Sequence, residues 1–210
     1  MTRQRHFSML RDFHLADWFT LANAFCGTGA IFAAMRYLQD GAGGNGIRDL
    51  MLGMALVPLA FIFDALDGRV ARWRKVASTL GRELDSLADV ISFGVAPAAL
   101  GYACGLQGGW DWLVLSYFVG CGVSRLARYN VTAETLSDGG DKVKYFEGTP
   151  IPTSVAIVVL LAVAAWQGAI GDALWFGHWQ LGPWQLHPLV LVYALSGSLM
   201  ISKTLRIPKP

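Results

Sequence analysis

The chain has 210 residues, of which 54% are hydrophobic and only 15% are charged. Soluble domains average about 25% charged residues, so this composition is typical of a membrane protein. The formal net charge of +2 is too small to favour nucleic-acid binding, and no basic patch is interleaved with aromatic residues. Cys26, Cys104 and Cys121 lie far apart in apolar segments, which predicts neither a disulfide framework nor a metal site.

Residues 1–16 are charged and precede the first apolar segment. Phe7 and Phe13 lie among Arg5 and Arg11, a pattern compatible with a short amphipathic helix at the membrane surface. A solvated basic tail is the alternative. Because the first apolar run begins after this charged segment and reaches spanning length, we expect no cleaved signal peptide.

Six apolar segments follow, each of about the 20 residues that a membrane-spanning helix requires. They predict an all-α integral membrane protein with six transmembrane helices in one domain, residues 17–205. The predicted spans lie near residues 17–38, 49–68, 84–104, 110–128, 152–171 and 186–202.

Asn23 lies within the first predicted span, among apolar residues. An unpaired amide is costly in such an environment, so we expect its side chain to form a hydrogen bond. The partner is either another helix or a bound nucleotide, and the sequence does not choose between them.

The basic residues are distributed unequally between the two sides of the predicted membrane domain. If both termini lie on one side, then only Arg36 and Arg48 of the 17 lysines and arginines fall on the other. By the positive-inside rule, the side with the N- and C-termini is predicted to be cytoplasmic. The expected location is a bacterial-type cytoplasmic membrane.

Four aspartates flank the connection between the second and third predicted spans. Asp64 and Asp67 are three residues apart at the end of one span, and Asp85 and Asp89 are four apart at the start of the next. These spacings place each pair on one face of a helix. Charges beside apolar runs are costly unless they are paired, solvated or bound to a cation.

Four carboxylates on two neighbouring helices would repel one another, and oxygen-ligated divalent cations remove that repulsion. Mg²⁺ and Mn²⁺ favour all-oxygen sites, and two metals about 4 Å apart can hold the attacking and leaving oxygens of a phosphoryl displacement. The pattern therefore predicts two divalent cations and phosphoryl transfer. For any single aspartate, the alternative is a helix cap or an ion-pair partner for Arg69, Arg72 or Arg82.

This stretch resembles the signature of the CDP-alcohol phosphatidyltransferases, D-x-x-D-G-x-x-A-R-x8-G-x-x-x-D-x-x-x-D. All defined positions match: Asp64, Asp67, Gly68, Ala71, Arg72, Gly81, Asp85 and Asp89. The resemblance implies a six-helix, usually homodimeric membrane fold whose active site opens to the cytoplasm. It also implies an enzyme that transfers a substituted phosphate group from a CDP-activated lipid to an alcohol.

The resemblance also implies roles for the motif residues. In that family the four aspartates bind two divalent cations, Mg²⁺ or Mn²⁺, and the last one, here Asp89, is the general base. CDP binding is implied for Asp67, Gly68, Ala71, Arg72 and Gly81. Glycines would let the nucleotide approach the backbone closely, and a guanidinium can pair with a phosphate oxygen. A membrane-surface anchor is the alternative role for Arg72.

Further segments resemble the phosphatidylserine synthases within that family, which implies CDP-diacylglycerol as the donor and L-serine as the acceptor. These segments are TLANAFCG at 20–27, ELDSLADVISFGVAPA at 83–98, RLARYN at 125–130 and FEGTPIP at 146–152. The serine carboxylate needs a cation, which Arg128 and Arg125 can supply from the cytoplasmic end of the fourth span. Snorkelling at a helix end is the alternative for either arginine.

Two other functions remain open at this point. One is the same transfer to another alcohol, such as glycerol phosphate or inositol phosphate. The other is a cation transporter, but transporters place such carboxylates near the bilayer midplane on broken helices. The four aspartates are instead predicted at one membrane face beside a basic connection, which favours the transferase.

Overall fold

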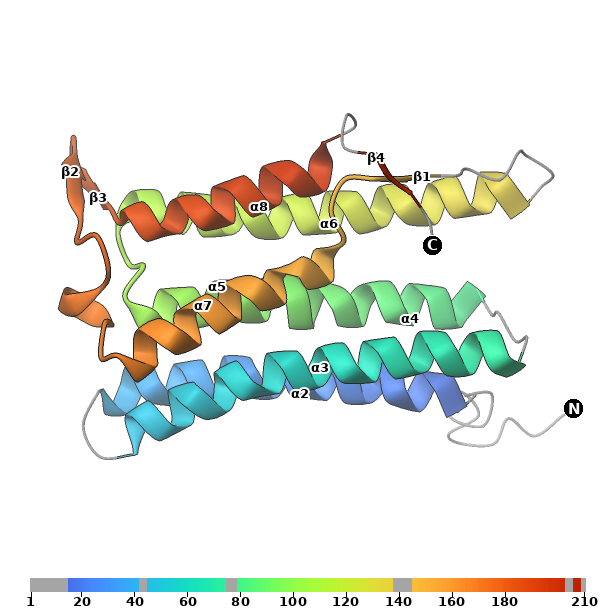
Figure 1. Ribbon diagram of the computed structural model, residues 1–210, viewed down its shortest axis with the longest axis horizontal. Helices are drawn as coiled ribbons and strands as arrows, with labels where there is room; N and C mark the ends of the chain where they lie inside the picture. The colour runs from blue at the N-terminus through green and yellow to red at the C-terminus, as the bar shows by residue number, and fades with distance from the viewer. Residues whose placement is uncertain (1–14, 42–44, 75–78, 138–144, 203–205, 209–210) are drawn as a thin grey trace, which may run out of the picture.

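Helices that run side by side form an elongated bundle in the computed structural model (Figure 1). The structure describes residues 15–41, 45–74, 79–137, 145–202 and 206–208. The α-helices are α2 (Leu15–Asp40), α3 (Gly46–Arg74), α4 (Thr79–Asp89), α5 (Ala96–Cys104), α6 (Gly109–Ser137), α7 (Val155–Trp166) and α8 (Leu191–Ile201). A π-helical turn, Val90–Val95, joins α4 to α5, so the three run as one rod.

Short elements complete the described part of the chain. One-turn 3₁₀ helices cover Ile151–Ser154, Gly171–Ala173 and Pro188–Val190, and the first and last of these lead into α7 and α8. The short strands form two antiparallel pairs: β1 (Tyr145–Glu147) with β4 (Arg206–Pro208), and β2 (Trp179–Leu181) with β3 (Trp184–Leu186).

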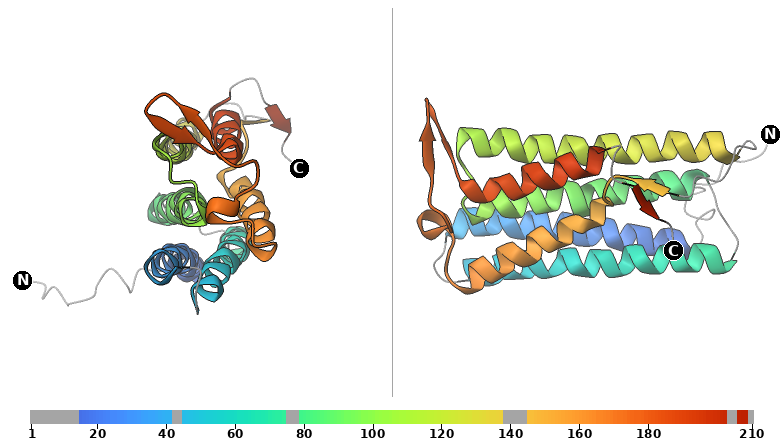
Figure 2. Two further views of the ribbon diagram at one scale, coloured as in Figure 1. Left: turned by 90° about the vertical axis from the view of Figure 1, so that its left-hand side faces the viewer. Right: turned by 45° about the horizontal axis from the view of Figure 1, so that its top comes forward.

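The rod made of α4, the π-helical turn and α5 lies in the middle of the bundle. It contacts α2 and α3 on one side and α6 on another, while α8 packs mainly on α6. The end-on view in Figure 2 shows this central position between the α2–α3 pair and the α6–α8 pair. Tyr193 of α8 is fully buried, and its hydroxyl donates to the carbonyl oxygen of Pro97 at 2.7 Å. Phe118 of α6 packs edge-on against the same ring.

Three helical stretches among the described residues are long and apolar enough to cross a membrane: Ala16–Asp40, Gly46–Val70 and Leu80–Cys104. They coincide with the first three predicted spans. Ile151–Trp166 and Pro188–Ile201 are apolar but shorter. Helix α6, which covers the fourth predicted span, is 29 residues long. The architecture is compatible with the predicted all-α membrane protein.

Apolar side chains cover the outside of the bundle as well as its core. Phe25, Phe32 and Leu195 are more than 60% exposed, whereas Leu50 and Phe93 are fully buried. A helix that is apolar on all sides is stable in a solvent that is itself apolar, such as lipid. The exposed aromatic and aliphatic surface therefore agrees with a bilayer around the bundle.

Some details differ from the sequence-based expectations. The fifth predicted span runs to residue 171, but α7 ends at Trp166 because Gly168 adopts a left-handed backbone, φ 71°, in the following turn. The short strands were not expected in an all-α protein. Each has only three residues; β1 pairs with the distant β4, whereas β2 and β3 form a local hairpin. The surface helix expected in residues 1–16 falls on residues of which only the last two are described.

The two ends of the bundle carry different features. The aspartate end carries Asp64, Asp67 and Asp85, and the hairpin end carries β2 and β3 (Figure 1). At the hairpin end, the fully buried carboxylate of Asp111 accepts hydrogen bonds from the backbone N–H groups of Gly108 and His187, both at 2.8 Å. Its Oδ2 atom also lies 2.5 Å from His187 Nδ1. Asp111 thus attaches the segment after β3 to the start of α6.

Candidate active site

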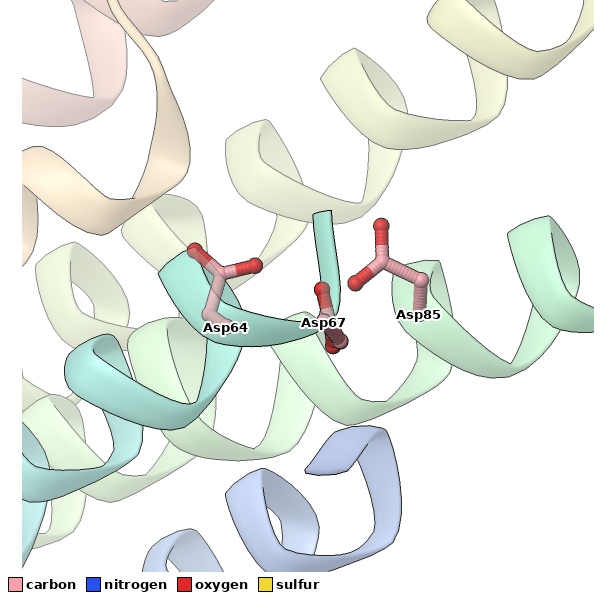
Figure 3. A group of neighbouring side chains, drawn as sticks. All are labelled: Asp64, Asp67 and Asp85. Carbon is pink, nitrogen blue, oxygen red and sulfur yellow. The ribbon is translucent and has the colours of Figure 1, made fainter. Parts of the chain in front are cut away.

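Three of the four motif aspartates converge where α3 runs alongside α4. Asp64 and Asp67 come from α3 and Asp85 comes from α4, and one oxygen of each lies within 4.8 Å of the others. Figure 3 shows the carboxyl groups of Asp64 and Asp85 pointing toward one another, with Asp67 between them in this view. The i, i+3 spacing on α3 places both of its carboxylates on the face turned to α4.

The chemistry of this donor set fits a divalent cation. Asp67 is buried, and Asp64 and Asp85 are half-buried. The Oδ1 atom of Asp85 is buried and accepts no hydrogen bond from any described residue. Carboxylates packed this closely repel one another, and a hard cation with oxygen ligands compensates for that repulsion.

Asp89 lies outside this group of three but close to it. It is the last residue of α4, it is buried, and its charge is near enough to interact with those of Asp64 and Asp85. The π-helical turn begins at the next residue. Such turns insert an extra residue into a helix and occur frequently at functional sites.

Helix α2 supplies polar contacts to the aspartates. Thr20 Oγ1 donates to Asp67 Oδ2 at 3.0 Å, and Asn23 Nδ2 donates to Asp89 Oδ1 at 3.2 Å. Asn23 thus bonds to another helix, one of the two partners expected from the sequence. No role was expected for Thr20 from the sequence, although it lies three residues before Asn23 on the same helix face. Two polar residues at that spacing in an apolar span are the signal that could have identified it.

The residues implied in CDP binding lie on α3 and α4. Gly68 follows Asp67 on α3, and a Cβ atom there would meet nothing within 4 Å among the described residues, so the backbone is open to a ligand. Gly81 is half-buried in the first turn of α4. Ala71 and Arg72 belong to the last turns of α3, and their side chains lie outside the part of the structure that is described.

The two arginines proposed from the sequence differ in their surroundings. Arg125 of α6 is half-buried, and its charge interacts with that of Asp89. Its Nε atom is buried and forms no hydrogen bond with any described residue. The side chain of Arg128, three residues further along α6, is exposed.

A polar contact ties α6 to α4 near the aspartates. Asn130 Nδ2 donates to Ser86 Oγ at 3.0 Å and to Glu83 Oε2 at 3.2 Å. Asn130 was part of a segment noted for its resemblance, but no role was expected for it. Its contacts fix the register of α6 against α4, and hence the position of Arg125 relative to Asp89.

Comparison with known proteins identifies the family. Residues 13–185 match the family model described as CDP-alcohol phosphatidyltransferase. The chain belongs to this family. The resemblance noted in the motif from Asp64 to Asp89 is therefore confirmed, and the match extends well beyond the motif.

Similar proteins are named CDP-diacylglycerol–serine O-phosphatidyltransferase. One from Saccharomyces cerevisiae is 45% identical, over 99% of this chain and 75% of that protein. One from Mycobacterium tuberculosis is 39% identical, over 62% of this chain and 46% of the relative. One from Methanocaldococcus jannaschii is 34% identical, over 73% of this chain and 62% of the relative.

Proposed function

We propose that this chain transfers the phosphatidyl group of CDP-diacylglycerol to the hydroxyl of L-serine and produces phosphatidylserine and CMP. The observation that carries the proposal is the convergence of Asp64, Asp67 and Asp85 beside Asp89 at one end of an apolar helix bundle. The family match and the names of the similar proteins supply the reaction class and the acceptor.

In the proposed reaction, the serine hydroxyl oxygen attacks the phosphorus atom that carries diacylglycerol. The new bond joins this oxygen to phosphorus, and the bond from phosphorus to the bridging pyrophosphate oxygen breaks, so that CMP leaves with the electron pair. Asp89 accepts the hydroxyl proton. Two divalent cations, Mg²⁺ or Mn²⁺, held by Asp64, Asp67, Asp85 and Asp89 would stabilise the negative charge of the pyrophosphate and of the departing CMP.

The donor nucleotide is proposed to lie along the turns of α3 and α4 that carry the remaining motif residues. Asp67, Gly68, Ala71, Arg72 and Gly81 would hold it. The open space over Gly68 supports this placement, because a nucleotide can approach the backbone only where no side chain intervenes. Arg72 would pair with a phosphate oxygen of CDP.

The acceptor is proposed to bind between α6 and Asp89. Arg125 and Arg128 would bind the serine carboxylate. Arg125 is the better placed because its half-buried guanidinium lies near Asp89 and its buried Nε has no acceptor among the described residues. A partly desolvated ion pair of this kind is stronger than one in open water.

In the membrane, α2, α3, the rod from α4 to α5, α6, α7 and α8 are proposed as six spans. Both termini and the aspartate end would face the cytoplasm, because the basic residues gather on that side. The family resemblance further suggests a homodimer, which a mass measurement in lipid nanodiscs would test.

The test of the proposed function uses purified protein, CDP-diacylglycerol and a panel of acceptors: serine, glycerol phosphate and inositol phosphate. We expect CMP release to depend on serine and on Mg²⁺ or Mn²⁺, with phosphatidylserine as the lipid product. Equal CMP release without serine, or a product containing another alcohol, would overturn serine as the acceptor. Serine-dependent turnover that persists after complete chelation of divalent cations would overturn the metal assignment.

A further inference from the structure

Helix α2 is held against the π-helical turn at its closest approach to the central rod. Ser92 Oγ, fully buried, donates to the backbone carbonyl oxygen of Asn23 at 2.8 Å. One turn along α2, a Cβ atom at Gly27 would lie 2.4 Å from Ser92 Oγ and 2.7 Å from Ser92 Cα. Only a glycine fits there, and this close contact determines the depth at which Asn23 meets Asp89.

The amide of Asn23 has a defined orientation and one unused group. Its side chain is fully buried, and Nδ2 donates to Asp89 Oδ1. An ionised carboxylate only accepts hydrogen bonds, so the opposite orientation of the amide would place two acceptors against each other. The Oδ1 atom of Asn23 therefore faces away from Asp89, and no described residue donates to it.

A buried carbonyl oxygen without a donor is costly, and native proteins rarely leave one unsatisfied. This oxygen belongs to the same amide that contacts Asp89, so it lies within a few ångströms of the carboxylate proposed to accept the hydroxyl proton. Arg125 approaches Asp89 from α6, a different helix. Among the described residues around Asp89 there are thus a cation on α6 and, on α2, an acceptor that receives no hydrogen bond from them.

We infer that Asn23 determines acceptor specificity, its Nδ2 orienting Asp89 and its Oδ1 receiving the ammonium group of an amino-alcohol acceptor. This inference rests on the proposed function. Asp89 would hold the hydroxyl, Arg125 the carboxylate and Asn23 the ammonium group. Three groups on three helices would then recognise the three functional groups of serine.

The test compares serine with glycerate, which carries a hydroxyl in place of the ammonium group. In the wild type we expect kcat/KM to be far higher for serine than for glycerate. Asn23→Leu, which removes the acceptor but nearly preserves the volume, should reduce this ratio about 10- to 150-fold, the range for a hydrogen bond to a charged group. The KM for CDP-diacylglycerol should stay the same.

Two control variants separate this role from general disturbance of the site. Ser92→Ala removes the hydrogen bond to the Asn23 backbone but leaves the amide, so the ratio should change less than threefold. Thr20→Val removes the contact to Asp67 and should weaken Mn²⁺ binding, measured by electron paramagnetic resonance, without altering the ratio. The ratio does not depend on the fraction of folded enzyme, because both acceptors are measured on the same preparation.

If Asn23→Leu has no measurable turnover, the binding of serine and glycerate, measured by thermal shift, still tests the role of Asn23. Serine should raise the Tm of the wild type saturated with metal and CMP, a mixture that cannot turn over, more than glycerate does, and the variant should lose this difference. An unchanged ratio, or an unchanged difference in Tm, would overturn the role of Asn23. If the wild type shows no serine-dependent CMP release, the proposed function itself fails, a result distinct from a failure confined to Asn23.

Discussion

At the scale of single residues, the motif aspartates differ in what surrounds their oxygens. Thr20 donates to Asp67 and Asn23 donates to Asp89, whereas Asp85 Oδ1 is buried and accepts nothing from the described residues. Because Asp85 Oδ1 has no such donor, Asp85 and the neighbouring Asp64 are the best positions at which to test cation binding.

Asp64→Asn and Asp85→Asn should each abolish metal-dependent turnover while the protein stays folded. A neutral amide is a weaker ligand, and it also relieves the repulsion between the carboxylates. Loss of an outer contact to a metal ligand typically costs roughly 10- to 100-fold, and loss of the ligand itself should cost more. CMP release and Mn²⁺ affinity are the measurements, with Asp172→Asn, an exposed aspartate at the hairpin end, as the matched control. Near-normal turnover of either variant at ordinary metal concentration would contradict the site.

Arg125→Ala and Arg128→Ala should raise the KM for serine and leave that for CDP-diacylglycerol nearly unchanged. Loss of a charge-assisted hydrogen bond costs about 1.5–3 kcal/mol, which corresponds to roughly 10- to 150-fold in kcat/KM. We expect the larger effect at Arg125, because its guanidinium is half-buried near Asp89 whereas Arg128 is exposed. If a variant binds the CDP-lipid more weakly and its KM for serine is unchanged, the substituted arginine binds the donor and not the acceptor.

The sequence predicted which carboxylates would lie together better than it predicted their hydrogen-bond partners. The spacing of Asp64, Asp67 and Asp85 already indicated two helix faces rich in carboxylates. That Thr20 would meet Asp67 could not be predicted, because such contacts depend on how far each helix is rotated and shifted relative to its neighbour. Local hydropathy contains no information on either quantity.

At the scale of elements, hydropathy located the first three spans to within four residues. It ended the fourth at residue 128, whereas α6 continues to Ser137, and it missed the irregular parts. The third predicted span is a single rod, yet six of its residues, Val90–Val95, form a π-helical turn. Between α7 and α8, β2 and β3 form a pair of strands that was not predicted, with Gln180 opposite Gln185. The π-helical turn packs against α2 and α6, contacts that hydropathy does not reveal. The hairpin is local, and the Gly182–Pro183 turn between its strands is a sequence signal that could have predicted it.

The attachment of the hairpin end should depend on Asp111. Asp111→Ala leaves the buried N–H groups of Gly108 and His187 without their acceptor, at about 1–3 kcal/mol for each donor. We expect Tm to fall by roughly 5–15 °C in thermal unfolding of the detergent-solubilised protein. The KM for serine should not change in the protein that remains folded, since the aspartates lie at the opposite end. Asp172→Asn is again the control, and an unchanged Tm for Asp111→Ala would show that this anchor does not stabilise the fold.

At the scale of the whole molecule, the proposed orientation can be tested with single introduced cysteines. The native cysteines are buried and should react little with a membrane-impermeant maleimide. Asp172→Cys at the hairpin end should be labelled in intact cells, and Trp73→Cys, an 83% exposed position beyond Asp67 on α3, only after permeabilisation. The reverse pattern would invert the proposed topology.

The position of the aspartates at one end of the bundle has a consequence for the bilayer itself. A donor lipid reaches these carboxylates only from the leaflet whose headgroups lie at that depth, and the product keeps the same two acyl chains. Each turnover would therefore leave a newly made anionic lipid in the leaflet that supplied the donor. The donor carries two ionised phosphates whereas phosphatidylserine has one net negative charge, so each cycle makes that leaflet less negative as CMP departs. The two leaflets become unequal in composition unless lipids are moved across the membrane.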